Sequence, residues 1–276
     1  MTSPPTTAII GLGLMGGSAA RDLAARGARI AAFDTDPDVV AAAVEAGVVA
    51  DPLDAGLGGV AQAEMIVIAT PVDVALETLG VIAPHLAPGA VVTDVGSVKR
   101  GIGERAQELG IGARFVGSHP LAGDHRSGWS AARDSLFAGM PVFICPTPAT
   151  EPDALARVAA LWAGLGARVA EMDAEAHDRR MAWLSHLPQV ASSALALALR
   201  RSEFHATDLG PGGRDATRLA ASSAEMWSAI AVANADHIAL AINELQHALE
   251  SFRHALDDRD PAALHKLFQT ARDWRG

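Results

Sequence analysis

The sequence has little cysteine: Cys145 is the only one among 276 residues. A single cysteine cannot form a disulfide within the chain, which favours a reducing compartment. The first residues, MTSPPTTAII, contain neither the basic segment nor the apolar segment of a signal peptide. We therefore expect a cytoplasmic protein.

Long hydrophobic runs and positive charge are also scarce. Apolar runs such as ASSALALAL (191–199) are too short to span a bilayer. The formal net charge of −10 disfavours nucleic acids and anionic membranes, because both bind clustered Lys and Arg. The metal-binding spacings HxxxH and HExxH are missing as well. We expect a small molecule as the partner, with no metal, nucleic acid or membrane.

What is present is a globular composition, half hydrophobic, in which the first part alternates strands and helices. Short apolar runs predict strands at 8–10, 28–33, 64–70, 90–98, 113–120, 141–146 and 167–173. Helical stretches between several of them indicate an α/β, Rossmann-like domain over residues 1–173. The remainder is almost wholly helical and predicts an all-α domain over residues 174–276.

A glycine-rich turn follows the first predicted strand. Its G-x-G-x-x-G pattern comprises Gly11, Leu12, Gly13, Leu14, Met15 and Gly16, and a helix follows it. In this pattern the first glycine permits the tight turn, the second lets the backbone approach a pyrophosphate, and the third lets helix and strand pack closely. The free N–H groups of the following helix favour an anion. The sequence therefore predicts a dinucleotide site.

The second predicted strand ends at Asp34, 18 residues after Gly16. A carboxylate at this position accepts hydrogen bonds from the adenosine ribose hydroxyls and repels a 2′-phosphate. Its neighbours in the DTDP stretch include no Lys or Arg to receive that phosphate. These features favour NAD over NADP, although a solvated loop aspartate is the alternative interpretation.

Other predicted strands end in small or polar residues: Thr70, Pro71, Gly96, Ser97, Ser118 and His119. Open parallel sheets bind ligands beyond the carboxyl ends of their strands, so we expect Ser97 and His119 to face one crevice with the nicotinamide. A neutral imidazole there could accept the proton of an alcohol while hydride leaves its carbon. The alternative is a structural histidine that only caps a strand.

The helical half carries three local signals. Residues 174–201 predict a long helix that is bent at Pro188, because proline has no N–H to donate. Ser222–Glu225 is a capping-box pattern and predicts the start of another helix. Apolar residues then recur at heptad spacing, at Ile238, Ile242, Leu245, Leu249, Phe252 and Leu256. Such a seam forms either the core of a bundle or a dimer interface, and we favour a homodimer through this domain.

Six motifs, in order, resemble those of the prephenate/arogenate (cyclohexadienyl) dehydrogenase family of tyrosine biosynthesis. They are GLGLMGGS, ATPVDV, DVGSVK, GSHPLAG, SHLPQ and GGRDATRLA. The resemblance runs from Ile9 to about Asn234. It implies a nucleotide-binding domain, a helical dimerisation domain and an NAD-dependent oxidative decarboxylation, in which hydride leaves the ring carbinol carbon, CO₂ departs and the ring becomes aromatic.

The resemblance also implies roles for individual residues. His119 corresponds to the acceptor of the hydroxyl proton, and Ser97 to the serine that hydrogen-bonds this histidine beside the nicotinamide. Arg218 corresponds to the arginine that grips a substrate carboxylate, which agrees with the bidentate geometry of a guanidinium. Arg214 is expected to be structural. We expect the substrate site to include Ser118, Ser185, His186 and Gln189.

Two positions depart from many relatives. Gln189 replaces a histidine near the substrate side chain; a neutral amide does not repel an ammonium, which favours arogenate or both substrates. Gly213 replaces an aromatic residue before the RDATR stretch, which puts the position of Arg218 in question.

Two other functions remain as alternatives. A 3-hydroxyacid or 6-phosphogluconate-type dehydrogenase has a similar layout but takes its base from a lysine on the first long helix of the second domain. Lys99 and Lys266 are the only lysines, and neither lies there. The second alternative is an NAD-binding sensor without chemistry.

Overall fold

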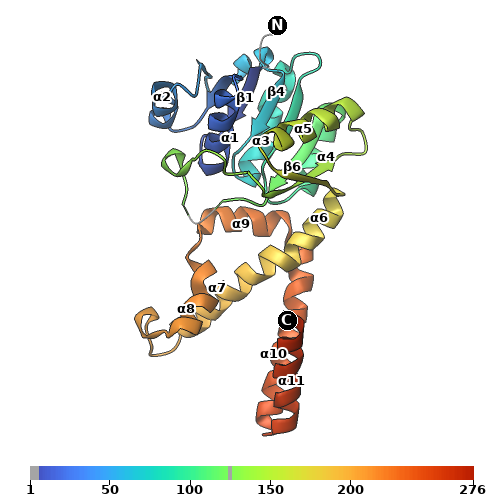
Figure 1. Ribbon diagram of the computed structural model, residues 1–276. Coiled ribbons are helices and arrows are strands. Elements are labelled where there is room, and N and C mark those ends of the chain that lie inside the picture. Colours follow the sequence, from blue (N-terminus) through green and yellow to red (C-terminus); the bar gives the residue numbers. More distant parts are fainter. Residues whose placement is uncertain (1–5, 124–125) are drawn as a thin grey trace. The chain divides into compact units, whose positions relative to one another are not determined.

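The computed structural model in Figure 1 describes residues 6–123 and 126–276. Its contacts divide the chain into two compact units. The sheet unit comprises Met1–Met181 and Ala221–Ala233, and the helical unit comprises Ala182–Ala220 and Asn234–Gly276. The ranges 1–173 and 174–276 remain a prediction about the domains.

The sheet unit is built on one sheet, with eight strands in the described part of the chain, in the order β3-β2-β1-β4-β5-β6-β7-β8. The strands are β1 (Thr6–Ile10), β2 (Arg29–Phe33), β3 (Asp51–Pro52), β4 (Met65–Ile68), β5 (Val91–Asp94), β6 (Phe115–Pro120), β7 (Pro141–Pro146) and β8 (Arg168–Glu171). All neighbours are parallel except β6 and β7. The predicted α/β class is therefore confirmed. The two-residue β3 was not predicted, because it is too short to leave a periodic pattern.

Helices cover both faces of this sheet, as Figure 1 shows. In the strands, successive side chains point to opposite faces. Ile9 accordingly packs with α1 (Leu14–Ala25), α2 (Pro37–Glu45) and α5 (Pro152–Gly164). Its neighbours Ala8 and Ile10 pack with α3 (Val72–Ile82), α4 (Arg100–Glu108) and α9 (Ala224–Ala233). The near-continuous apolar strands follow from this burial on both faces.

Two features beyond residue 173 also belong to the sheet unit. Helix α6 (Ala174–Met181) packs on β7 and α4, and α9 packs on α3. The start of α9 was predicted at the Ser222–Glu225 capping box; the observed cap lies one residue later, where the Ser223 hydroxyl accepts a hydrogen bond from the Met226 N–H at 3.2 Å.

The helical unit begins with a π-helical turn, η5 (Ala182–His186), which leads into α7 (Leu187–Arg200). The predicted long helix is therefore interrupted, and the irregular turn ends two residues before Pro188. The cause is the missing N–H of Pro188, which leaves the preceding turn without one regular helical hydrogen bond. The unit continues with α8 (Pro211–Thr217), η7 (Arg218–Ala221), α10 (Ala235–Asp257) and α11 (Pro261–Arg275).

The predicted heptad seam lies on α10 and is only partly covered within the unit. Ile238 is buried, and the Phe252 ring lies 5.1 Å from the Phe268 ring of α11. Leu249 and Leu256 are exposed.

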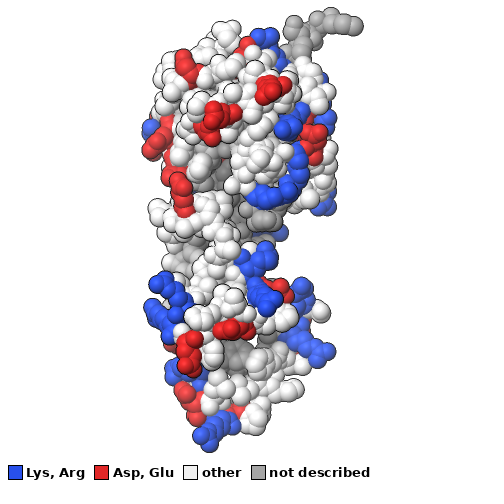
Figure 2. Space-filling view, turned by 90° about the vertical axis from the view of Figure 1, so that its left-hand side faces the viewer, with Lys and Arg blue, Asp and Glu red and all other residues white. Residues whose placement is uncertain are grey.

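In the described part of the chain, every helix is too short or too polar to cross a membrane. Figure 2 shows acidic and basic side chains together on the visible face of each unit.

Candidate active site

The glycine turn joins β1 to α1. Gly11 has φ +94°, and a Cβ there would lie 2.6 Å from the Ala69 carbonyl oxygen. A Cβ on Gly16 would lie 1.9 Å from the Gly11 oxygen, so this position brings the helix against the turn. A Cβ on Gly13 would meet nothing within 4 Å. The backbone at Gly13 is thus open to an approaching ligand, next to the unpaired N–H groups that begin α1.

Asp34 follows β2 and faces the same turn. Its carboxylate accepts hydrogen bonds from the Leu12 N–H at 2.7 Å and the Asp36 N–H at 3.0 Å. A pocket of about 890 Å³ lies beside it, lined mostly by apolar side chains such as Phe33, Val40 and Leu53; among the described residues, no Lys or Arg lines it. An adenosine without a 2′-phosphate fits these surroundings, so the residues present fit NAD.

Because β6 is parallel to β5 and β4, His119 lies at the edge of the sheet that carries the glycine turn. Its side chain is 8% exposed. Its Nδ1 atom is 2.9 Å from Nε2 of His177 on α6, and the two rings meet at 73°. The ring is therefore fixed by a second, fully buried histidine.

The loops after β4 and β5 place the other predicted residues at this edge. Thr70 and Pro71 follow β4, and the Gly96 N–H donates to Asp94 at 2.7 Å after β5. Ser97 is half-buried. Within the described residues its hydroxyl makes no hydrogen bond, so the bond to His119 that the resemblance implies is absent. His177 occupies Nδ1 of His119 instead.

A buried polar network lies behind His119. Lys99 and Asp94 form an ion pair with side chains 0% and 1% exposed, and Lys99 Nζ also donates to the Ser118 carbonyl at 2.8 Å. The Ser118 hydroxyl is 2.7 Å from the Thr93 hydroxyl and accepts from the Trp162 indole N–H at 2.9 Å. Ser118 thus joins β5 and α5 in the core, and its contacts give no support to a role in substrate binding.

The remaining predicted residues lie in the helical unit. Arg218 is exposed at the start of η7, and within the described residues nothing pairs with its guanidinium. Gln189 is buried on α7 and donates to the Leu219 carbonyl at 2.8 Å, which ties α7 to the segment that carries Arg218. His186 is buried and lies 3.1 Å from the side-chain nitrogen of Asn234. Ser185, in η5, is half-buried.

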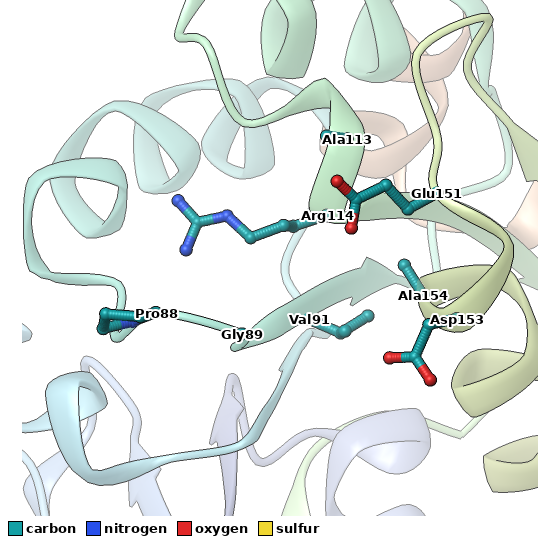
Figure 3. Close-up of a pocket in the computed structure, with 8 residues that line it drawn as sticks. All are labelled: Pro88, Gly89, Val91, Ala113, Arg114, Glu151, Asp153 and Ala154. Atoms are coloured by element: carbon teal, nitrogen blue, oxygen red, sulfur yellow. The ribbon is translucent and has the colours of Figure 1, made fainter.

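Another pocket, of about 360 Å³, lies at the opposite edge of the sheet (Figure 3). Val91 begins β5, and Arg114 directly precedes β6. This pocket is therefore at the amino ends of the parallel strands, whereas ligands of such sheets bind at the carboxyl ends.

In the described residues, no three His, Cys, Asp or Glu side chains are placed to hold a metal ion.

His177 and Asp178, adjacent residues at the centre of α6, were not among the predicted site residues. Both are fully buried, and the His177 Nδ1 atom lies 2.8 Å from the Asp178 carboxylate. The one signal in the sequence is a His-Asp pair in a helix that directly follows the last strand. Only the packing of α6 on β7 brings this pair to His119.

Comparison with known proteins agrees with this geometry. The family model for the nucleotide-binding domain of prephenate dehydrogenase matches residues 19–171, and that for its dimerization domain matches residues 173–270. Prephenate dehydrogenase of Bacillus subtilis is 33% identical over 98% of this chain and 75% of its own. Cyclohexadienyl dehydrogenase of Zymomonas mobilis is 30% identical over 97% of this chain and 94% of its own.

Solved structures are similar over almost the whole chain. Prephenate dehydrogenase from A. aeolicus, crystallised with hydroxyphenyl propionate and NAD⁺, superposes with a TM-score of 0.90 at 28% identity, covering 99% of this chain and 98% of that one. Synechocystis arogenate dehydrogenase superposes with a TM-score of 0.84 at 30% identity, covering 98% of each chain. The glycine turn, the buried histidine at the sheet edge and these matches lead to one conclusion: the chain belongs to the prephenate dehydrogenase family.

Proposed function

We propose that the chain catalyses the NAD-dependent oxidative decarboxylation of prephenate, arogenate or both, in the biosynthesis of tyrosine. The observation that carries the proposal is the position of His119, which is buried at the same edge of the sheet as the glycine turn and Asp34. An NAD fold with a fixed imidazole at this edge suits the oxidation of an alcohol.

In this proposal His119 accepts the proton of the ring hydroxyl. Proton removal pushes electrons toward C=O formation, and loss of the ring carboxylate as CO₂ then makes the ring aromatic. NAD, when bound, supplies the acceptor for the hydride of the carbinol carbon. The turn from Gly11 to Gly16 holds its pyrophosphate and Asp34 its adenosine ribose, while Thr70, Pro71, Gly96 and Ser97 border the nicotinamide. Ser97 also lies beside the substrate hydroxyl.

Substrate recognition is assigned to the helical unit. Arg218 binds a substrate carboxylate, and its unpaired guanidinium suits this role because its donors are not used within the described residues. Gln189, Ser185 and His186 contact the substrate side chain. Gln189 carries no charge that would repel the ammonium of arogenate, which favours arogenate or the use of both substrates.

The partner is a small molecule, and the chain acts as a cytoplasmic homodimer through its helical domain, without nucleic acid or membrane. The family's dimerization domain over residues 173–270 supports the dimer. So do the exposed apolar side chains of α10 and α11: Leu240, Leu249, Leu256, Phe268 and Trp274.

One experiment tests the reaction. The purified chain is mixed with NAD and, separately, with prephenate, arogenate, 3-hydroxyisobutyrate and 6-phosphogluconate, and NADH absorbance is followed. We expect NADH to form with prephenate, arogenate or both, and with neither 3-hydroxyisobutyrate nor 6-phosphogluconate. A signal with a hydroxyacid alone would favour the rival dehydrogenase class, which the lysine positions disfavour. NAD binding without NADH formation on any substrate would favour a sensor.

A further inference from the structure

We propose that His177 and Asp178 are positioning residues that hold His119 in one tautomer, with its proton on Nδ1, so that Nε2 accepts the substrate proton. The proposal rests on the function proposed above. It concerns a chain of three groups in the sheet unit: the Asp178 carboxylate, the His177 ring and the His119 ring.

The direction of this chain is set at Asp178. Its Oδ1 accepts from the Lys99 N–H at 2.8 Å and its Oδ2 from the Arg100 N–H at 2.9 Å. These N–H groups stand at the start of α4, where no residue of that helix supplies a side-chain cap. Backbone N–H groups only donate, and a helix N-terminus favours an anion, so Asp178 is an ionised acceptor.

The protons of both rings follow from this carboxylate. His177 Nδ1, 2.8 Å from Asp178 Oδ1, must donate. In a neutral imidazole the other nitrogen is then an acceptor, so His177 Nε2 accepts from His119 Nδ1 at 2.9 Å. His119 Nε2 therefore carries no proton in the neutral enzyme. This is the state that a general base requires.

The competing arrangement is a doubly protonated His177, which would donate to His119 and place the proton on the wrong nitrogen. Burial opposes it, because the His177 side chain is fully buried and a buried cation is costly. The N-terminus of α4, whose Lys99 and Arg100 N–H groups donate to Asp178, adds positive potential there. Neutral His177 is thus the favoured state.

Within the described residues, we consider charged and titratable groups from β5, the start of α4, β7 and α6 around these three groups. Asp94 lies on β5 and Lys99 precedes α4, and these two neutralise each other. Cys145 lies on β7, and Arg180 of α6 stands over the Phe143 ring. Burial of Cys145 keeps its thiol neutral at ordinary pH. Asp178 is therefore the charge that is hydrogen-bonded directly to His177.

The direct test is ring ¹⁵N NMR of histidine-labelled enzyme, with the His119 signals assigned by comparison with His119→Asn. We expect Nδ1 of His119 to be protonated and Nε2 to be unprotonated at a pH where the ring is neutral. A proton on Nε2 would overturn the proposal even if the enzyme is active. If the expected tautomer is found but the protein forms no NADH, the positioning role of His177 and Asp178 is supported and the proposed reaction is refuted.

Variants test the consequence for the base. His177→Leu removes the acceptor, whereas the Gln oxygen in His177→Gln can stand close to the place of Nε2. We expect kcat to fall about 10²-fold or more in His177→Leu, within the range of a positioned base, and to recover to within about tenfold in His177→Gln. KM and NAD affinity stay unchanged, which separates positioning from binding. His85→Gln, at an exposed site, is the control for histidine replacement.

The pH profile gives a readout that a purely structural role would not change. A hydrogen bond to His177 stabilises the protonated His119 ring more than the neutral ring. In His177→Leu the acidic limb of kcat/KM should therefore move to lower pH, and it should return in His177→Gln. An unmoved limb in His177→Leu, with the fold intact by circular dichroism, contradicts the proposal. If His177→Leu does not fold, the proton position on His119 in the unmodified enzyme, measured by NMR, still tests the proposal.

Asp178→Leu tests the carboxylate, because it removes the acceptor that requires His177 Nδ1 to donate. Asn is a weaker test, since an amide oxygen at the place of Oδ1 could still accept from both His177 and the Lys99 N–H. In Asp178→Leu, with the fold checked by circular dichroism, we expect kcat to fall about 10²-fold or more, within the range of a positioned base. We also expect the His119 proton to be no longer confined to Nδ1 by NMR. Retention of the Nδ1 proton in this variant would show that Asp178 only caps α4.

Discussion

At the scale of single residues, His119 carries the chemistry and gives the sharpest prediction. His119→Asn should lower kcat by about 10²–10⁴, the usual contribution of a positioned base, and should remove the acidic limb of the pH profile of kcat/KM. NAD affinity, measured by calorimetry, should not change. Ser97→Ala should cost less, because it leaves the base in place. Near-normal turnover in His119→Asn would make this histidine only a strand cap.

Arg218 should act on binding rather than on turnover. If it pairs with a carboxylate equally in the ground and transition states, Arg218→Ala raises KM while kcat falls little. The expected rise is roughly 30- to 1,000-fold, equivalent to about 2–4 kcal/mol, and Arg218→Lys should recover only part of it. Arg214→Ala is the matched control, because Arg214 donates to the Leu209 carbonyl at 2.8 Å. If KM rises only in Arg214→Ala, then Arg214 binds the substrate carboxylate and Arg218 does not.

The buried thiol of Cys145 makes the free energy of unfolding depend on pH. Burial raises the pKa of its thiol from 9.0 to about 12. Below pH 9 the thiol is protonated in both states; above it the unfolded chain loses the proton and the folded chain keeps it, so stability falls as pH rises toward 12. From pH 7 to pH 10 this contribution is about 1.4 kcal/mol. Urea unfolding should show that Cys145→Ala loses less stability than the unmodified protein over this interval. Equal losses would contradict the prediction.

Among the secondary-structure elements, the turn between β1 and α1 contains glycines with different roles: Gly13 serves cofactor binding, and Gly16 serves folding as well. A Cβ on Gly13 has open space, so Gly13→Ala should keep the melting temperature and weaken NAD binding at least about tenfold, because it obstructs the pyrophosphate. A Cβ on Gly16 would collide with backbone, so Gly16→Ala should lower both. Gly101→Ala, in open space on α4, is the control. Unchanged NAD affinity in Gly13→Ala would place the pyrophosphate elsewhere.

At the scale of the whole molecule, the exposed apolar side chains of α10 and α11 predict self-association. Light scattering should give twice the chain mass of 28.4 kDa. Leu249→Glu should shift the mass to that of a single chain, because a charge at an apolar interface loses its solvation. Gln246→Glu, on the exposed polar surface of the same helix, should remain dimeric. A dimer that survives Leu249→Glu would place the interface on another surface.

Local residue patterns were sufficient to predict most elements, apart from the two-residue β3, and the chemistry of the cofactor turn. Strand positions follow from short apolar runs, the cofactor turn from glycines at fixed spacing, and the interruption of the helix near residue 188 from proline. These features depend on backbone conformations and side-chain periodicity within a few residues. For the same reason, motif order was enough to indicate the family.

Which groups meet depends on packing between elements that are distant in the sequence. His177 and Asp178 lie 58 residues or more from His119 in sequence, and the packing of α6 on β7 brings His177 within 2.9 Å of it. Packing also turned the Ser118 hydroxyl toward Trp162 and Thr93, and joined Gln189 to the Leu219 carbonyl. Such contacts depend on how distant elements pack, a property that no local pattern in the sequence contains.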